Sequence, residues 1–177
     1  MPNMAQQLSQ HNSKVRRGKQ VVASGGCNCT GGVPLGHQGP AVESCPMQGN
    51  CQARGVVYCA SVTNLITKEE EKYTGLTEGT FKKRHTGHTG NFRHKDQAHK
   101  TRLATHVHKL QDRGTPHSIS WQILSRASGY NPTTGMCRLC LKEKFLIMFS
   151  PTTATLNLRS EIFSSCRHRQ GKLLDKT

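Results

Sequence analysis

Alternating hydrophobic and polar residues predict a β-hairpin beginning near Gly55. A period of two residues is typical of a half-buried strand. The polar stretch 63–71 predicts a turn, and residues 72–76 predict the paired strand. A second alternation, over residues 118–123, predicts a third strand. The apolar positions of the first and third strands are Val56, Tyr58, Ala60, Val62, Ile119, Trp121 and Ile123.

The first predicted helix covers residues 78–88. Thr77 precedes it as a candidate N-cap, because a threonine hydroxyl accepts hydrogen bonds from the first amides of a helix. Spacings of three and four residues place Phe81, Arg84 and His88 on one face. The glycines that follow predict its end.

Two further helices are predicted, over residues 101–111 and 136–149. Leu103, Val107 and Leu110 give the first an apolar stripe. The second is apolar over most of its surface, which predicts that it is buried, and Pro151 ends it. The Tyr130-Asn131-Pro132 sequence between them predicts a turn.

The resulting order of elements predicts an α+β fold, with a sheet of about three strands packed against helices. We expect four segments along the chain. Residues 1–26 are polar and basic, which predicts a disordered tail, and residues 27–54 form a cysteine-rich segment suited to zinc. The main domain is expected over 55–158, followed by a C-terminal segment, 159–177.

The chain is strongly basic, with 25 Lys and Arg against 10 Asp and Glu, a net charge of +15. Most of this charge, +13, lies in residues 79–177. This imbalance favours a polyanionic partner, nucleic acid first, although a merely solvated basic surface remains the alternative. The longest apolar run, residues 145–149, is too short to cross a membrane. The low hydrophobic content, 33%, indicates a thin core that needs a metal or a partner.

Only one acidic residue, Glu143, occurs between Asp112 and Glu161. It lies on the last predicted helix between Lys142 and Lys144. Its carboxylate could pair with these lysines, or it could bind Mg²⁺ or Mn²⁺, since Mg²⁺ often takes one or two protein carboxylates and fills its shell with water and phosphate oxygens.

Eight cysteines without an apolar leader indicate metal binding rather than disulfides. Near the C-terminus three thiolates and one imidazole are spaced as a closed structural zinc site. They are Cys137, Cys140, Cys166 and His168. An earlier set suggests a second zinc site with looser spacing, in which His37 could replace a thiolate. Its members are Cys27, Cys29, Cys45 and Cys51. Cys59, inside the first strand, is expected to be a small buried residue.

Several short motifs follow one another in an order that resembles the GIY-YIG nuclease family. They are Gly55-Val56-Val57-Tyr58, Tyr73-Thr74-Gly75, Arg84 and His88 on one helix, a strand, the Glu143 helix and Leu156-Asn157. The family implies a metal-dependent endonuclease, with a tyrosine strand followed by a second tyrosine strand and a helix. The first motif has its glycine one place early, and the second has Thr74 where Ile or Val is usual.

The resemblance also implies roles for individual residues. Tyr58 would lie near the attacking water and could act as its general base, and Tyr73 would line the site. Arg84 would contact the scissile phosphate, with His88 assisting on the same helical face. Glu143 would hold the catalytic Mg²⁺ or Mn²⁺, and Asn157 would brace the site.

The cysteine motifs narrow this resemblance to the GIY-YIG endonuclease region of Penelope-like retroelements. They are Cys-Asn-Cys at 27–29, Cys-Pro-x-x-Gly-x-Cys at 45–51, Cys-x-Leu-Cys-Leu-x-Glu-Lys at 137–144, and Leu-Asn-x-Arg-Ser-Glu at 156–161 followed by Cys-Arg-His at 166–168. This implies nicking of nuclear DNA, with a reverse transcriptase of the same element as a partner.

Two other functions are open at this stage. The chain could be a zinc-stabilised module that binds nucleic acid without cutting it, or a zinc module that binds proteins. The basic run 14–19 fits a nuclear import signal, or only a basic tail.

Overall fold

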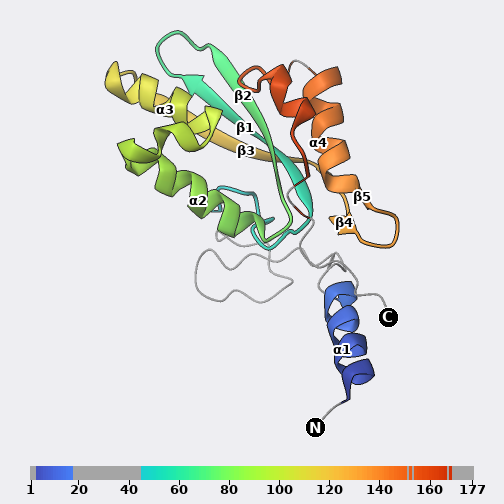
Figure 1. Cartoon of the computed structure of the whole chain (residues 1–177). Helices are drawn as coiled ribbons and strands as arrows, with labels where there is room; N and C mark the ends of the chain where they lie inside the picture. Colours follow the sequence, from blue (N-terminus) through green and yellow to red (C-terminus); the bar gives the residue numbers. More distant parts are fainter. Residues whose placement is uncertain (1–2, 18–44, 151, 153, 167, 169–177) are drawn as a thin grey trace.

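The computed structural model describes residues 3–17, 45–150, 152, 154–166 and 168. A three-stranded antiparallel sheet lies between two helices on one face and a third helix on the other (Figure 1). The predicted α+β class and three-stranded sheet are therefore confirmed.

The sheet has the order β2-β1-β3, with β1 (Val56–Asn64) in the centre, β2 (Glu70–Thr77) at one edge and β3 (His117–Arg126) at the other. The β1–β2 hairpin pairs Tyr58 with Gly75 and Ala60 with Tyr73. Because side chains on neighbouring strands share a face when their residues are paired, both tyrosines point to the same side of the sheet.

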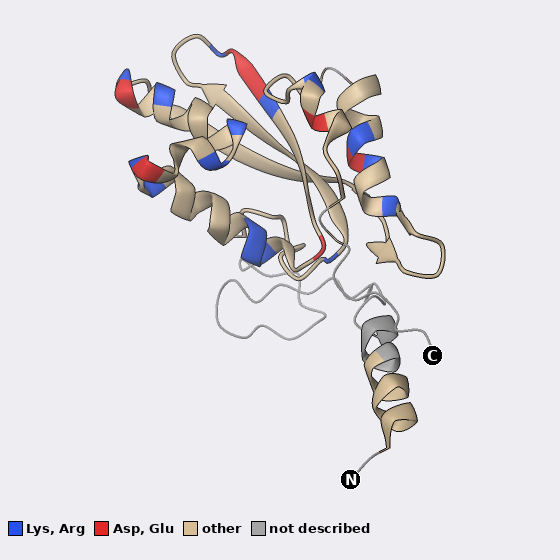
Figure 2. Cartoon of the chain, viewed as in Figure 1, with Lys and Arg blue, Asp and Glu red and all other residues tan. Residues whose placement is uncertain are grey.

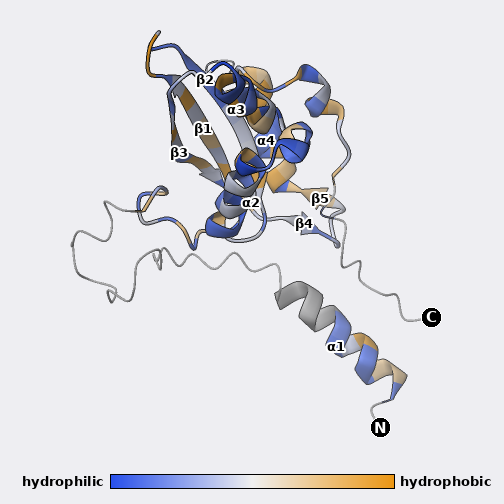
Figure 3. Cartoon of the chain, turned by 90° about the vertical axis from the view of Figure 1, so that its left-hand side faces the viewer, coloured by the Kyte–Doolittle hydropathy of each residue, from blue (hydrophilic) through white to orange (hydrophobic). Residues whose placement is uncertain are grey.

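That side of the sheet is covered by α2 (Phe81–Arg93) and α3 (Arg102–Asp112), joined by the 3₁₀ helix η1 (Lys95–Lys100). Their apolar residues pack with the inward positions of β1 and with Trp121. The opposite face is covered by α4 (Arg138–Phe149), where Leu139 packs on Val57. Both faces of β1 are thus buried, and Cys59 is buried as expected. Figure 3 shows hydrophobic stretches along the strands of the sheet and on α4.

The segment before β1 closes the end of the sheet next to α2. The backbone amides of Phe81 and Lys82 donate to the carbonyls of Ala53 and Cys51, at 2.8 and 2.7 Å. These are free amides of a helix N-terminus that need acceptors. Residues 45–53 therefore hold the first turn of α2 in place.

The boundaries of α2 differ from the prediction. Its N-cap is Thr80, whose hydroxyl accepts from the amide of Lys83, and not Thr77. The helix also continues past Gly87 and Gly90 to Arg93. An internal glycine costs only about 1 kcal/mol, which the packing of Phe81 and His88 on the sheet offsets.

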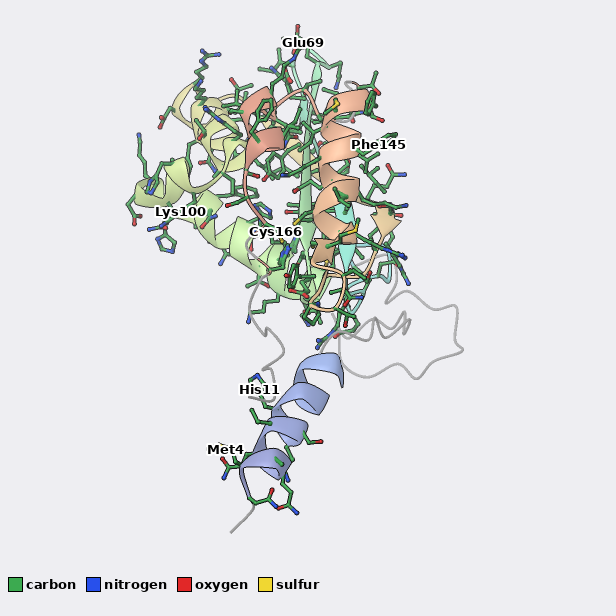
Figure 4. All side chains as sticks on the ribbon, turned by 45° about the vertical axis from the view of Figure 1, so that its right-hand side comes forward. Met4, His11, Glu69, Lys100, Phe145 and Cys166 are labelled. Atoms are coloured by element: carbon green, nitrogen blue, oxygen red, sulfur yellow. The ribbon has the colours of Figure 1, made fainter. Side chains whose placement is uncertain are left out.

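The last helix, α4, is less buried than its composition predicts. Phe145 and Phe149 are 59% and 63% exposed, and their ring centroids lie 4.8 Å apart with the rings tilted by 41°. Figure 4 shows Phe145 pointing outward from α4. One side of this helix packs on β1 and β2 and the segment after it also contacts the helix, but Phe145 and Phe149 stay exposed. The expected turn at Tyr130–Asn131 is instead the short strand β4, paired with β5 (Met136–Cys137).

The predicted disordered tail is wrong for residues 4–17, which form helix α1 (Met4–Arg17). Asn3 and Gln6 bond reciprocally, since the Asn3 side chain accepts from the Gln6 amide and the Gln6 side chain accepts from the Asn3 amide. This capping box and a run without Gly or Pro support the helix. η3 (Arg159–Phe163) follows α4 near the C-terminus. No helix within the described residues is long and apolar enough to cross a membrane.

Candidate active site and metal centre

Three of the predicted site residues form one hydrogen-bonded chain. Nε of Arg84 donates to the Tyr58 hydroxyl at 2.9 Å. The guanidinium can only donate, so the hydroxyl proton is free to point at Nε2 of His88, 2.7 Å away. Arg84 and His88 reach Tyr58 together because they are four residues apart on α2.

The protonation states agree with this direction of donation. Burial raises the pKa of Tyr58 to about 12, against the opposing charge of Arg84. Burial also lowers the pKa of His88 to about 3, and the neighbouring Arg84 and His85 act in the same direction. Near neutral pH the phenol is therefore protonated and the imidazole neutral. His88 Nδ1 has no hydrogen-bond partner among the described residues.

Gly75 is required by the position of the Tyr58 ring. A Cβ atom at residue 75 would lie 2.6 Å from the Tyr58 hydroxyl oxygen and 2.9 Å from Cε1 of Tyr73. Both distances are shorter than van der Waals contact. The Tyr-x-Gly motif thus leaves room for both tyrosine rings on one face of the sheet.

Tyr73 lies beside this chain of hydrogen bonds. Its ring meets the His88 ring edge-on, with centroids 6.1 Å apart. Burial, followed by the nearby Tyr58, raises its pKa well above the usual range. Phe81 and Trp121 pack against the Tyr58 ring, at centroid distances of 5.2 and 5.8 Å. These contacts hold the Tyr58 phenol in place.

Arg84 and Glu143 come from opposite faces of the sheet and line one cavity of about 480 Å³. Tyr58 and His88 line neither this cavity nor its neighbour, and they are 0% and 1% exposed. Among the predicted catalytic residues, Arg84 and Glu143 line the first cavity and Tyr73 lines its neighbour, and Cys140 and His168 of the cysteine cluster also line the first.

The Glu143 carboxylate is suited to a cation. Burial and the charge of Glu161 raise its pKa to about 7, while Arg84 and Lys144 act to lower it. Within the described part of the chain, no hydrogen bond to this carboxylate is formed. Its oxygens are the hard ligands that Mg²⁺ or Mn²⁺ takes, so the residues present fit such an ion.

The side chain of Asn157 pairs with the backbone of β2. Its side chain accepts from the Thr74 amide at 2.7 Å and donates to the Thr74 carbonyl at 2.9 Å, as a neighbouring strand would. It also donates to Glu161 at 2.7 Å. Glu161 was not predicted as a site residue, although it ends the Leu-Asn-x-Arg-Ser-Glu motif at 156–161.

The C-terminal cysteine cluster is assembled. Its four ligand atoms, from Cys137, Cys140, Cys166 and His168, lie within 4.8 Å of one another. The Sγ atoms of Cys140 and Cys166 are 3.4 Å apart, and His168 Nδ1 is 3.2 Å from the Cys140 Sγ. Tetrahedral zinc with Zn–S bonds of about 2.3 Å places sulfurs about 3.8 Å apart. This cluster could hold a metal such as zinc.

The position of the cluster links two parts of the chain. Cys137 and Cys140 stand at the start of α4, one turn before Glu143, and Cys166 follows η3. Cys166 is labelled in Figure 4, where it lies close to α4. A metal there would fix the segment that carries Asn157 and Glu161 against α4.

The second zinc site remains a prediction. Cys45 and Cys51 are buried in the core beside α2. Their expected partners, Cys27 and Cys29, and the alternative ligand His37, lie outside the described residues.

Comparison of the chain with family models, with curated proteins and with solved structures finds no match.

Proposed function

We propose that this protein is a metal-dependent DNA endonuclease of the GIY-YIG type, which hydrolyses phosphodiester bonds. The observation that carries the proposal is the hydrogen-bonded set of Arg84, Tyr58 and His88 beside a cavity that Arg84 shares with Glu143. Phosphodiester hydrolysis needs a group that neutralises the phosphate, a cation site and an oriented proton carrier. This set supplies candidates for all three.

Arg84 is the residue that would bind the scissile phosphate. Its Nε is used by Tyr58, which leaves the terminal guanidinium nitrogens to face the cavity and bind phosphate oxygens. A Mg²⁺ or Mn²⁺ ion held by Glu143 would add charge neutralisation on the same phosphate. Glu161 lines the same cavity, and after burial its charge helps to raise the pKa of Glu143.

Tyr58 would act through its hydrogen bonds. In the resting state its hydroxyl is buried and Arg84 links it to the cavity, so Tyr58 first positions Arg84. When Arg84 turns towards a phosphate, the hydroxyl becomes accessible and His88 Nε2 accepts its proton. A cation held by Glu143 would favour the phenolate form of Tyr58.

The remaining expectations belong to the same proposal. Zinc at the C-terminal cluster would be structural, because four protein ligands leave no open position for a reacting water. The nicked DNA would prime a reverse transcriptase of the same retroelement, in the nucleus. The strong positive charge, spread over the helices around the sheet in Figure 2, supports DNA as the substrate.

A second function is favoured by one observation. Because Tyr58 and His88 are buried behind Arg84, the chain could bind nucleic acid without cutting it. In that alternative, Arg84 contacts phosphate and its partners serve only to orient it.

Plasmid nicking separates these two functions. Zinc-loaded protein is incubated with supercoiled plasmid and Mg²⁺ or Mn²⁺, with a chelator as the blank. Wild type is expected to produce open circles, whereas Arg84→Ala and Glu143→Ala lose about 10²–10³ in rate or more. Glu69→Gln, an exposed change in the β1–β2 turn, is the matched control. Nicking by Glu143→Ala at the wild-type rate would refute the proposed site.

A further inference from the structure

A second cavity, of about 530 Å³, lies next to the first. Arg84 and Glu161 line both cavities, so the two meet at these side chains. The rest of the second cavity comes from Tyr73 and from the corner between η1 and α3, including Lys100 and Arg102. No residue of this corner was identified as functional from the sequence.

The two cavities differ in charge. The first is lined by three carboxylates, from Glu78, Glu143 and Glu161, against the two cations of Arg84 and Lys144. The second contains three permanent cations, from Arg84, Lys100 and Arg102, against the single carboxylate of Glu161. Asn157 already donates to that carboxylate. One side of Arg84 therefore suits a cation, and the other side suits an anion.

The cations of the second cavity are available to a ligand. In the described part of the chain, the ion pairs are Lys72–Glu70 and Lys95–Asp112, so neither Lys100 nor Arg102 is neutralised by an acidic residue. Both side chains are exposed. Figure 4 shows Lys100 at the outer surface, far from Phe145 in that view.

Local hydrogen bonds fix the corner that carries these cations. The Thr101 hydroxyl accepts from the Ala104 amide at 3.1 Å. The Thr105 hydroxyl donates to the carbonyls of Ala98 and Thr101, at 2.9 and 3.1 Å. Leu103 is fully buried and anchors the first turn of α3 in the core. The two cations thus project from a rigid corner, which lowers the entropic cost of binding.

We propose that this second cavity binds a backbone phosphate of the nucleic acid, next to the phosphate held by Arg84. The inference rests on the proposed function. It adds the path of the bound nucleic-acid strand, which runs from the Glu143 side of Arg84 to the η1–α3 corner. The ligand is a phosphodiester anion. Arg102 can bind two of its oxygens through a planar fork, and Lys100 adds a point charge.

The test compares two double variants that remove equal charge. Lys100→Ala with Arg102→Ala removes the cations of the cavity. Lys109→Ala with Arg113→Ala removes two exposed cations at the other end of α3, outside both cavities. Binding of a fluorescent DNA duplex is measured by anisotropy in chelator, so that no cleavage is needed, across a series of salt concentrations. Thermal melts confirm that both variants are folded.

The cavity variant is expected to bind about 10-fold or more weakly, with a salt slope smaller by about one to two. The salt slope of the control variant should differ from that of wild type by no more than about half of the change expected for the cavity variant. Equal losses in the two variants, or none in the cavity variant, would overturn the inference. The inference would also be overturned if binding of inorganic phosphate depended on Lys100 and Arg102 while binding of DNA did not depend on them.

Failure of the two proposals can be told apart. If the cavity variant loses DNA binding but wild type never nicks plasmid, the phosphate subsite stands and the nuclease proposal falls. If wild type nicks DNA and the cavity variant binds like wild type, the nuclease proposal stands and the subsite falls.

Discussion

Replacing Gly75 by alanine tests whether the close approach of β2 to Tyr58 builds the site. The new methyl carbon would lie 2.6 Å from the Tyr58 hydroxyl oxygen, 2.8 Å from its Cζ and 2.9 Å from Cε1 of Tyr73. An ordinary carbon contact needs about 3.5 Å or more. The rings of Tyr58 and Tyr73 must therefore each shift by close to an ångström.

The rings have little freedom to make that shift. Tyr58 is fully buried between Phe81 and Trp121, and its hydroxyl is bonded to both Arg84 and His88. Overpacking of this kind costs about 1–3 kcal/mol, and losing one of the two hydrogen bonds adds about 0.5–1.5 kcal/mol. We expect Gly75→Ala to lower the free energy of unfolding by about 2–4 kcal/mol.

The measurement is urea unfolding of the zinc-loaded protein, followed by far-ultraviolet circular dichroism. Gly87→Ala is the matched control, because a Cβ there meets no atom within 4 Å. That change should raise stability by about 0.5–1 kcal/mol, since alanine is the better helix former.

A double-mutant cycle identifies the atom responsible. Tyr58→Phe removes the oxygen nearest to the new methyl group, so it should relieve part of the strain. The double variant Gly75→Ala with Tyr58→Phe is expected to be more stable than the sum of the single losses, by about 1 kcal/mol. Additive losses, or a Gly75→Ala variant as stable as wild type, would refute this explanation of the motif.

Three further predictions concern the surroundings of the site. Asn157→Ala removes both bonds to Thr74, and urea unfolding should show a loss of about 1–3 kcal/mol. Cys140→Ser should abolish binding of about one zinc per chain, measured by metal analysis after dialysis, and Cys59→Ala should leave it intact. His88 stays neutral in the folded protein, where its pKa is lowered to about 3, whereas in the unfolded chain it takes up a proton below its ordinary pKa of 6.5. The free energy of unfolding therefore falls as the pH is lowered from about 6.5 towards about 3. His88→Gln should reduce the dependence of the free energy of unfolding on pH by about 1.4 kcal/mol per pH unit between pH 6 and 4.5. An unchanged dependence on pH would contradict the buried, neutral imidazole.

The sequence by itself determined the local elements and the pairs of residues that such elements bring together. Period-two alternation located β1 and β3, and helical spacing placed Arg84 and His88 on one face of α2. The spacing of Cys137, Cys140, Cys166 and His168 predicted a cluster that could hold a metal, and these side chains do lie together. These predictions depend on periodicity and on the chemistry of metal ligands, and both can be read from the local sequence.

Only the tertiary structure decided how these elements meet. Burial of Tyr58 behind Arg84, the entry of Glu161 into the cavity and the basic corner at Lys100 all join residues far apart in the chain. The exposure of Phe145 likewise depends on what covers α4, which its composition does not specify. Packing across the sheet decides which side chains are buried and which line a cavity. The local sequence does not specify which distant side chain will fill a given space.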